Sequence, residues 1–253
     1  LWVFDPYDGE SSSGVNRGVT YWSDGMQERL FYVAGSSLYC INPNNGLLIE
    51  SFADSGIVDL YKNLVRDANF TWVTAATPGI VYKDLIILGS TLGEGPSPAA
   101  PGHIRAYNVK SGEFKWIFHT IPHPGEYGYE TWPEDAWKTA GGANSWGGFT
   151  LDVERGIVFC GTGSPTYDHW GGDRKGMNLF GNCILALNAE TGERIWHYQL
   201  VHHDIWDYDI PCQPNLVTVE IAGKKIDAVA QPTKMGHLFI LDRETGKPIF
   251  PVK

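Results

Sequence analysis

The stretch Ala106-Tyr107-Asn108, followed by Gly112 and Trp116, contains the unit that decides the fold. An apolar strand ends at Asn, a short turn follows, and Gly precedes a second strand that carries Trp. Asn or Asp caps such a turn, and Gly adopts the positive φ that the turn requires. The unit therefore predicts a tight antiparallel hairpin, whose Trp can pack against a neighbouring unit.

This unit recurs three times, which is typical of a repeat architecture. The other copies are Leu38–Asn42 with Gly46, Ala186–Asn188 with Gly192 and Trp196, and Phe239–Asp242 with Gly246. Successive glycines are 66, 80 and 54 residues apart, whereas a four-stranded blade takes about 40–50 residues. We therefore expect an all-β chain, a β-propeller of four-stranded blades with long loops between strands. Residues 1–253 form one partial domain of about four blades, incomplete at both ends, or about half of a larger ring.

Helical signals are weak and predict only one turn at Glu134–Thr139 and a short helix at Asp59–Ala68. The chain has 253 residues, with 29 acidic against 19 basic residues and a net charge of −10. No run of Lys or Arg occurs, which argues against nucleic-acid binding. Even the longest apolar runs are short, such as Leu85–Leu88, so we expect no membrane-spanning segment. The chain begins at Leu1 without a signal peptide, so we expect a mature or truncated product.

The four cysteines have neither the spacing of a zinc site nor a C-x-x-C-H haem motif. Cys160 and Cys183 lie inside apolar runs, and we expect both to be inert buried thiols. The other two are Cys40 and Cys212.

Five segments in order along the chain resemble one enzyme family, the quinoprotein alcohol and sugar dehydrogenases, which use pyrroloquinoline quinone (PQQ). They are Val15–Trp22, Ala143–Trp146, Gly161–Pro165, Trp196–Asp209, and Lys234 with Phe239–Arg243. The run His202–Asp207 is most similar to the membrane-type glucose and quinate dehydrogenase branch. The resemblance implies an eight-bladed propeller with PQQ on its axis, of which this chain supplies about half.

By this resemblance Asp207 is the catalytic base, which takes the proton of the substrate hydroxyl and also approaches a metal. Its flanking residues Trp206 and Tyr208 are unusual for a solvated loop, although an Asp that caps a turn is the alternative. Asp209 would lie on the same face if the chain is extended there. In some relatives the matching Asp is an added lanthanide ligand, and in the glucose-type branch it has no such role.

The resemblance also assigns a metal site to Glu94 and Ser164, together with Asp207. Hard cations such as Ca²⁺ or Mg²⁺ prefer oxygen ligands of this kind, and a lanthanide stays possible. Glu94 lies among glycines, which leave room for the backbone to approach a cofactor. An exposed loop Glu is the alternative. Ser164 stands where methanol-type relatives have Asn, so it offers only a hydroxyl.

Four residues resemble the family's PQQ contacts. The Trp146 indole would stack on the quinone, and Arg17 would pair with one of its three carboxylates. Lys234 would contact the quinone oxygens and stabilise the charge that develops on reduction, which makes it catalytic as well as cofactor-binding. Thr91 would hydrogen-bond a PQQ carboxylate. A structural Trp and surface cations are the alternatives.

One sequence feature differs from the family pattern, and the role of two histidines stays open. Ser11-Ser12-Ser13 replaces the adjacent cysteines whose disulfide covers PQQ in methanol-type relatives. His202 and His203 fit either the substrate entrance or a packing role.

The sequence therefore predicts a PQQ- and metal-dependent dehydrogenase that oxidises an alcohol, sugar or polyol. Its electrons would pass to a quinone or a cytochrome outside this chain, and the family implies a periplasmic location. Two alternatives remain, a non-catalytic propeller scaffold of the outer-membrane assembly type and a carbohydrate-binding module. The joint presence of Arg17, Glu94, Trp146, Asp207 and Lys234 distinguishes the enzyme from the scaffold.

Overall fold

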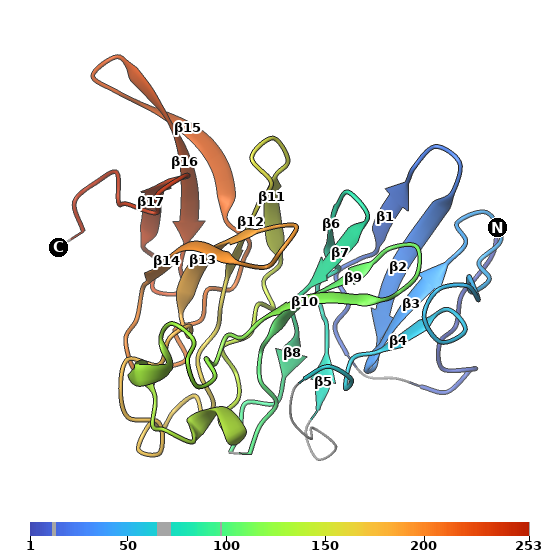
Figure 1. Ribbon diagram of the computed structural model, residues 1–253, viewed down its shortest axis with the longest axis horizontal. Helices are drawn as coiled ribbons and strands as arrows, with labels where there is room; N and C mark the ends of the chain where they lie inside the picture. The colour runs from blue at the N-terminus through green and yellow to red at the C-terminus, as the bar shows by residue number, and fades with distance from the viewer. Residues whose placement is uncertain (12–13, 65–71, 97, 253) are drawn as a thin grey trace.

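The computed structural model describes residues 1–11, 14–64, 72–96 and 98–252, and it contains a row of antiparallel sheets (Figure 1). Three sheets have four strands, one has three, and one is a small pair of two-residue strands. This arrangement confirms the all-β propeller of four-stranded blades. Among the described residues no helix is long and apolar enough to cross a membrane.

Blade 1 has the strand order β1-β2-β3-β4, blade 2 has β10-β9-β7-β6, blade 3 has β11-β12-β13-β14, and blade 4 has β15-β16-β17. Strands β5 and β8 form the small pair. The bounds are β1 Thr20–Ser23, β2 Glu28–Ala34, β3 Ser37–Ile41, β4 Ile57–Asp59, β5 Val73–Thr74, β6 Ile80–Tyr82, β7 Leu85–Leu88, β8 Thr91–Leu92, β9 Ile104–Asn108, β10 Phe114–Phe118, β11 Phe149–Asp152, β12 Ile157–Gly161, β13 Cys183–Asn188, β14 Arg194–Gln199, β15 Asn215–Ile221, β16 Lys224–Pro232 and β17 Leu238–Asp242.

The repeated turns share one geometry. In each turn the N–H of Gly donates to the carbonyl of the Asn or Asp four residues earlier, at 2.8–2.9 Å. The glycines have φ between 70° and 75°, where other residues are strained. The four donor–acceptor pairs are Gly46–Asn42, Gly112–Asn108, Gly192–Asn188 and Gly246–Asp242.

Tryptophans join successive blades at these turns, as the sequence predicts. Trp116 of blade 2 lies on Gly192 of blade 3, and Trp196 of blade 3 lies on Gly246 of blade 4. A Cβ at Gly192 would be 2.4 Å from the Trp116 ring, and one at Gly246 would be 2.6 Å from Trp196. The indole N–H of Trp196 also donates to the Arg243 carbonyl at 3.0 Å. Gly is therefore required both for the turn and for the contact between blades.

The core consists of apolar residues that fill the space between neighbouring sheets. Cys160 and Cys183 are 1% and 0% exposed and lie in the layer between blades 2 and 3. Burial raises the pKa of the Cys160 thiol to about 12. Their expected role as inert core thiols is confirmed, and all four cysteines are free.

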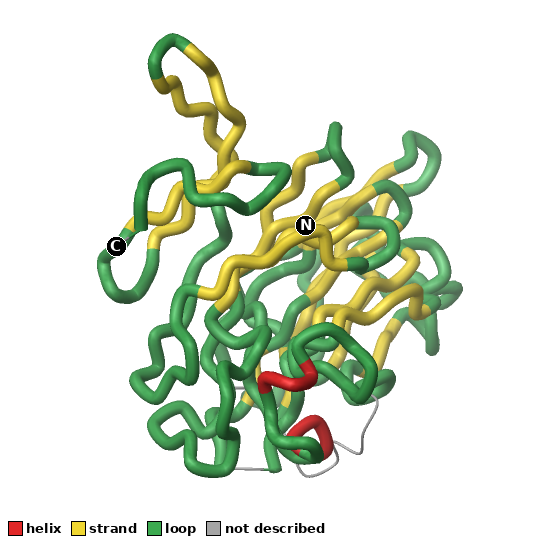
Figure 2. The backbone as a smooth tube through the Cα atoms, turned by 60° about the vertical axis from the view of Figure 1, so that its left-hand side comes forward, coloured by secondary structure: helices red, strands yellow, loops and turns green. Residues whose placement is uncertain are grey.

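Long connections gather below the sheets, and the one between β10 and β11 carries both helices of the described residues (Figure 2). The predicted turn at Glu134–Thr139 is confirmed as the 3-10 helix η2, Ala136–Lys138, which follows η1, Tyr129–Thr131. The helix expected at Asp59–Ala68 is wrong where the chain is described. Asp59 ends β4 and its carboxylate accepts the N–H of Tyr61 at 2.9 Å, which starts a turn instead. Residues 65–68 lie outside the described part.

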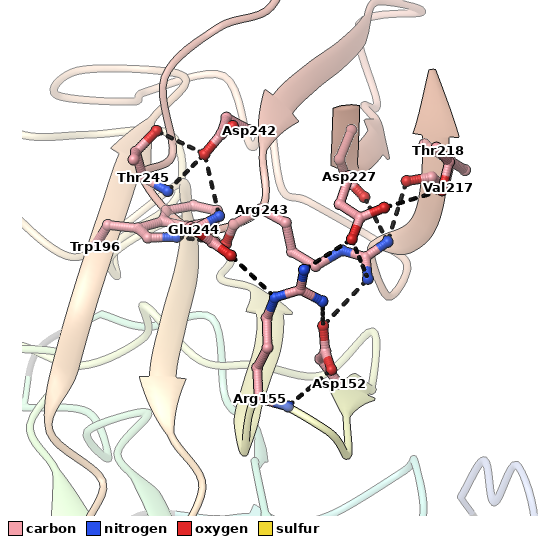
Figure 3. Close-up of polar contacts among 11 residues, drawn as sticks. Asp152, Arg155, Trp196, Val217, Thr218, Asp227, Asp242, Arg243, Glu244 and Thr245 are labelled. Carbon is pink, nitrogen blue, oxygen red and sulfur yellow. Dashed lines mark hydrogen bonds and ion pairs between the residues drawn. The ribbon is translucent and has the colours of Figure 1, made fainter. Parts of the chain in front are cut away.

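A charged network joins blades 3 and 4 (Figure 3). Arg155, in the β11–β12 turn, contacts Asp152 at 2.9 Å, Asp227 at 2.8 Å and Glu244 at 3.2 Å. Arg243 contacts the same Asp152 oxygen at 3.1 Å. We call these five residues the boundary network. Because each acid has an arginine partner, the network fixes one blade against the next.

Candidate functional site

A cavity of about 340 Å³ brings together every cofactor, metal and catalytic residue predicted from the sequence. Its walls come from the segment before β1, the ends of β5 and β8, and the loops after β10, β12, β14 and β16. The residues that line it are Val15, Arg17, Ala76, Thr91, Leu92, Gly93, Glu94, Gly142, Asn144, Trp146, Ser164, Thr166, Asp168, Asp207, Asp209 and Lys234.

Asp207 and Lys234 form an ion pair in this cavity. The Lys234 Nζ lies 2.6 Å from Oδ2 of Asp207, and the two side chains are 42% and 31% exposed. Asp207 has a φ of 57°, a backbone conformation that is uncommon for a residue other than Gly. Burial lowers the pKa of Lys234, but the hydrogen bond to Asp207 and the negative charge of Asp209 outweigh this and raise it. Lys234 therefore stays a cation beside the carboxylate.

Both carboxylate oxygens of Asp209 accept hydrogen bonds from other residues that line the cavity. One oxygen accepts the indole N–H of Trp146 at 2.9 Å, and the other accepts the backbone N–H of Ser164 at 2.6 Å. Gly163 makes this possible, because a Cβ there would lie 2.6 Å from Asp209 and 3.3 Å from the indole nitrogen. The chain is not extended between Asp207 and Asp209, since φ is positive at Asp207. Both carboxylates line the cavity all the same.

Arg17 and Thr91 also line the cavity. The Arg17 guanidinium lies over the Trp146 ring, 5.6 Å from its centroid, which is a cation–π distance. The backbone N–H of Arg17 donates to the carbonyl of Ala76 at 2.8 Å, and the N–H of Ala76 donates to the Thr91 hydroxyl at 3.2 Å. These bonds tie the segment before β1 to the β5–β8 pair. The Arg17 side chain is exposed and the Thr91 hydroxyl keeps its own proton to donate.

The cavity holds an excess of acid. Burial and the negative charges of Asp209, Asp207 and Glu94 together raise the pKa of Asp168 to about 7. The pKa of Asp209 is raised as well, chiefly by burial. Glu94 is exposed beside Gly93, where a Cβ would have no atom within 4 Å. Carboxylates in this arrangement favour a bound cation.

Asp204, which the sequence analysis did not single out, organises the loop that carries Asp207. It is 1% exposed, and its carboxylate accepts the N–H groups of Trp206 at 2.9 Å and Tyr208 at 2.7 Å. It also accepts the Ser164 hydroxyl at 2.5 Å and the Asn182 amide at 2.9 Å. These bonds hold the tight turn in which Asp207 takes its positive φ.

Ser164 lines the cavity, but its hydroxyl is hydrogen-bonded to the buried Asp204. It donates to Asp204 and accepts the amide of Asn182 at 3.2 Å. Its backbone N–H, by contrast, binds the cavity residue Asp209. As a metal ligand Ser164 would first have to give up its bond to Asp204.

Sequence reasoning missed Asp168, Asp204 and Asn182, and no spacing or repeat in the chain marks them. Among the residues described, His202 and His203 are not part of the cavity lining. His203 instead contacts the Gly176 carbonyl at 2.9 Å through Nδ1, which is a packing role. Residues 12 and 13 of the run Ser11-Ser12-Ser13 lie outside the described part of the chain.

The residues present fit PQQ with a hard cation. Arg17 and Lys234 provide positive charge for carboxylates and quinone oxygens, and Trp146 provides a planar face. Glu94 and Asp207 provide anionic oxygens, the ligands that Ca²⁺ prefers. The raised pKa of Asp168 is a physical sign that a positive charge belongs in this space.

Fold and cavity together define a class, a propeller that binds a polyanionic cofactor and a cation. The sequence pattern described as "Glucose/ethanol/alcohol dehydrogenase, beta-propeller domain", designated PQQ, matches residues 1–253. The chain therefore belongs to the family of PQQ-dependent dehydrogenases.

Named relatives agree with this membership. The chain is 33% identical over 267 residues to a quinoprotein glucose dehydrogenase of Escherichia coli (strain K12), covering 99% of this chain and 33% of that protein. It is 33% identical over 218 residues to a quinate/shikimate dehydrogenase (quinone) of Acinetobacter baylyi, covering 85% and 27%. The structure of quinohemoprotein alcohol dehydrogenase from Comamonas testosteroni matches with a TM-score of 0.76 and 26% identity, covering 94% and 36%. The chain thus spans about a third of the length of these relatives.

Proposed function

We propose that this chain carries the cofactor site of a PQQ- and metal-dependent dehydrogenase that oxidises an alcohol, sugar or polyol. The observation that supports it most is that five residues from distant parts of the sequence line one cavity. They are Arg17, Glu94, Trp146, Asp207 and Lys234. A protein-binding scaffold has no physical need to bring this set together.

In this proposal Asp207 is the base that accepts the proton of the substrate hydroxyl. Its loop is fixed by Asp204, so the carboxylate is held in place before substrate arrives. Lys234, 2.6 Å away, stabilises the ionised carboxylate and provides positive charge beside the place where negative charge develops. When bound, PQQ supplies the quinone that accepts the hydride of the substrate carbon.

Other residues bind and orient. Trp146, held by Asp209, presents its ring to the cofactor, and Arg17 pairs with a cofactor carboxylate. Glu94 and Asp207 are the proposed ligands of Ca²⁺, with Mg²⁺ or a lanthanide as alternatives. Ser164 is the weakest ligand of the proposed set because its hydroxyl already binds Asp204.

The proposal extends to partners outside this chain. Electrons pass to a quinone or a cytochrome, and further propeller blades complete the ring. The periplasm is the proposed location.

Titration of the full-length protein with PQQ, with and without Ca²⁺, tests the proposal. We expect metal-dependent PQQ uptake, followed by dye reduction with members of a sugar and alcohol panel. Absence of PQQ uptake with Ca²⁺, Mg²⁺ or a lanthanide would reject the enzyme and favour the scaffold.

Lys234→Ala separates the roles within the cavity. Loss of the cation should lower turnover about 100-fold or weaken PQQ binding, because one preorganised charge is removed. The matched control is Lys175→Ala, since Lys175 is exposed and does not line the cavity. Equal turnover in the two variants would return Lys234 to the role of a surface lysine.

A further inference from the structure

Three histidines gather at the end of blade 2, outside the cavity described above. His103 directly precedes β9 and His119 directly follows β10, and their neighbours Ile104 and Phe118 are paired across the two strands. Antiparallel register therefore brings His103 and His119 together, and their ring centroids are 4.7 Å apart. His123 returns four residues later and stacks on His119 at 3.9 Å, with an angle of 8° between the rings.

One nitrogen of each ring lies within 4.8 Å of the corresponding nitrogens of the other two rings. His103 is buried, and His119 and His123 are half-buried. Imidazole is a preferred ligand of Zn²⁺ and Cu²⁺, whereas Ca²⁺ and Mg²⁺ prefer oxygen. The cluster is therefore chemically unlike the carboxylate-rich cavity.

The His119 ring is oriented as metal-binding imidazoles usually are. Its Nδ1 lies 2.8 Å from Oε1 of Glu126, an acceptor that fixes the proton on Nδ1. Its Nε2 then carries a lone pair, and this atom is buried without a hydrogen-bond partner. A buried polar atom without a partner is costly, and nothing in apolar packing requires it.

Glu126 also fixes the position of His123. Its second oxygen accepts the backbone N–H of His123 at 2.7 Å, and its own N–H donates to the His123 carbonyl at 3.0 Å. One carboxylate thus holds the ring of His119 and the backbone of His123. The backbone N–H of Thr120 donates to Nδ1 of His103 at the longer distance of 3.2 Å, a contact that a metal bond at this nitrogen would replace.

We propose that His103, His119 and His123 form a second metal site, for a divalent ion of the zinc and copper class. Two zinc–nitrogen bonds of about 2.0–2.1 Å span at most about 4 Å, so the rings close around the ion by side-chain rotation. A water molecule takes the fourth position. The site would tie the loop that follows β10 to the start of β9.

Metal titration of the full-length protein, loaded beforehand with PQQ and Ca²⁺, tests the site. We expect uptake of one Zn²⁺ per chain by calorimetry, and the absorption of a four-coordinate ion when Co²⁺ is the probe. His119→Gln and His123→Gln should each abolish both signals. His169→Gln and His237→Gln are matched controls, because these two histidines are exposed and outside the cluster.

Two further measurements keep the test decisive. Glu126→Gln should weaken Zn²⁺ binding by about 10–100-fold, as loss of a partner of a metal-bound histidine does. Zn²⁺ should raise the unfolding temperature of the parent protein and of the control variants, but not that of His123→Gln. If His119→Gln does not fold, the half-buried His123→Gln decides. No uptake of Zn²⁺ or Co²⁺, or uptake unchanged in His123→Gln, would overturn the proposal.

Discussion

The cavity and the boundary network are both clusters of Asp, Glu and basic side chains, but their charges are balanced differently. In the boundary network every acid contacts an arginine within 3.2 Å, and Asp152 contacts two. Among the described residues of the cavity, four acids face two cations, and only Asp207 forms an ion pair. A satisfied network stabilises the fold, whereas an excess of one charge indicates a place for a ligand.

The titration of the two clusters reflects the same difference. Hydrogen bonds from Arg155 lower the pKa of Asp227, and those from Arg155 and Arg243 lower the pKa of Asp152 despite its burial. In the cavity, burial and neighbouring acids raise the pKa of Asp168 to about 7. The boundary network therefore stabilises the folded state at neutral pH, and the cavity destabilises it until a cation binds.

The largest effect we expect is on catalysis. Asp207→Asn should lower turnover by about 10²–10⁴-fold, because the base is lost while the shape of the side chain is kept. PQQ uptake should be largely preserved, and steady-state dye reduction with a saturating substrate measures the change. Asp173→Asn, an exposed loop substitution, is the control. Full turnover in Asp207→Asn would remove this residue from the catalytic role.

The boundary network should behave in the opposite way. Asp152→Ala should lower the free energy of unfolding by about 2 kcal/mol, because two partly exposed arginines lose a charged hydrogen-bond partner. Turnover and PQQ affinity should be unchanged below the unfolding transition. Urea unfolding of the parent, of this variant and of the exposed control Glu220→Gln measures the difference. A loss no larger than that of the control would mean that the network does not stabilise the blade contact.

Removing one acid from the cavity should stabilise the metal-free protein. The folded-state pKa of Asp168 is above its unfolded value, so its ionisation destabilises the fold at high pH. This effect shrinks as pH falls below about 7 and is gone only below the unfolded pKa of about 4. Asp168→Asn should therefore raise the free energy of unfolding by about 1 kcal/mol at pH 8 and by less at pH 5. Urea unfolding measures this gain. An equal gain in free energy of unfolding at pH 8 and pH 5 would argue against charge repulsion between Asp168 and the other cavity acids as the cause.

A second pH effect should come from His197, which belongs to neither cluster. Burial and the charge of Arg194 lower the pKa of His197 to about 4. The unfolded protein then binds the extra proton, so stability falls as pH drops from about 6.5 to about 4. His197→Gln should remove about 1 kcal/mol of this loss, whereas the boundary acids lose their effect only below about pH 4. The free energy of unfolding is measured against pH for the parent protein and for His197→Gln, so that the contributions of all other groups cancel in the difference. A difference that does not change between pH 6.5 and 4 would refute the lowered pKa of His197.

The repeat made the blades predictable. The Asn-to-Gly turns at Asn108, Asn188 and Asp242 depend on local backbone chemistry, and the structure has them as expected. The packing of Trp116 and Trp196 on the next turn also follows from a unit that repeats. The helix expected at Asp59–Ala68 is wrong for the described residues 59–64, because the Asp59 carboxylate accepts the N–H of Tyr61 and starts a turn.

The residues of the cavity were predicted through a resemblance, and their contacts were not. Neither the partners of Asp209 nor the engagement of Ser164 with Asp204 has a signal in the sequence. The histidine cluster was missed for the same reason. Its members are spaced 16 and 4 residues apart; the register of β9 and β10 brings His103 to His119, and the turn held by Glu126 brings His123 to them.

The sequence by itself determined the turn chemistry, because each turn depends on residues a few positions apart, and the recurrence of that turn predicted the blades. The tertiary structure decided which groups meet. Lys234 reaches Asp207 from a different blade, and Arg17 reaches Trp146 across the cavity. Burial and the distances between charges, which set the pKa of Asp168 and the balance of each cluster, exist only once the blades have packed.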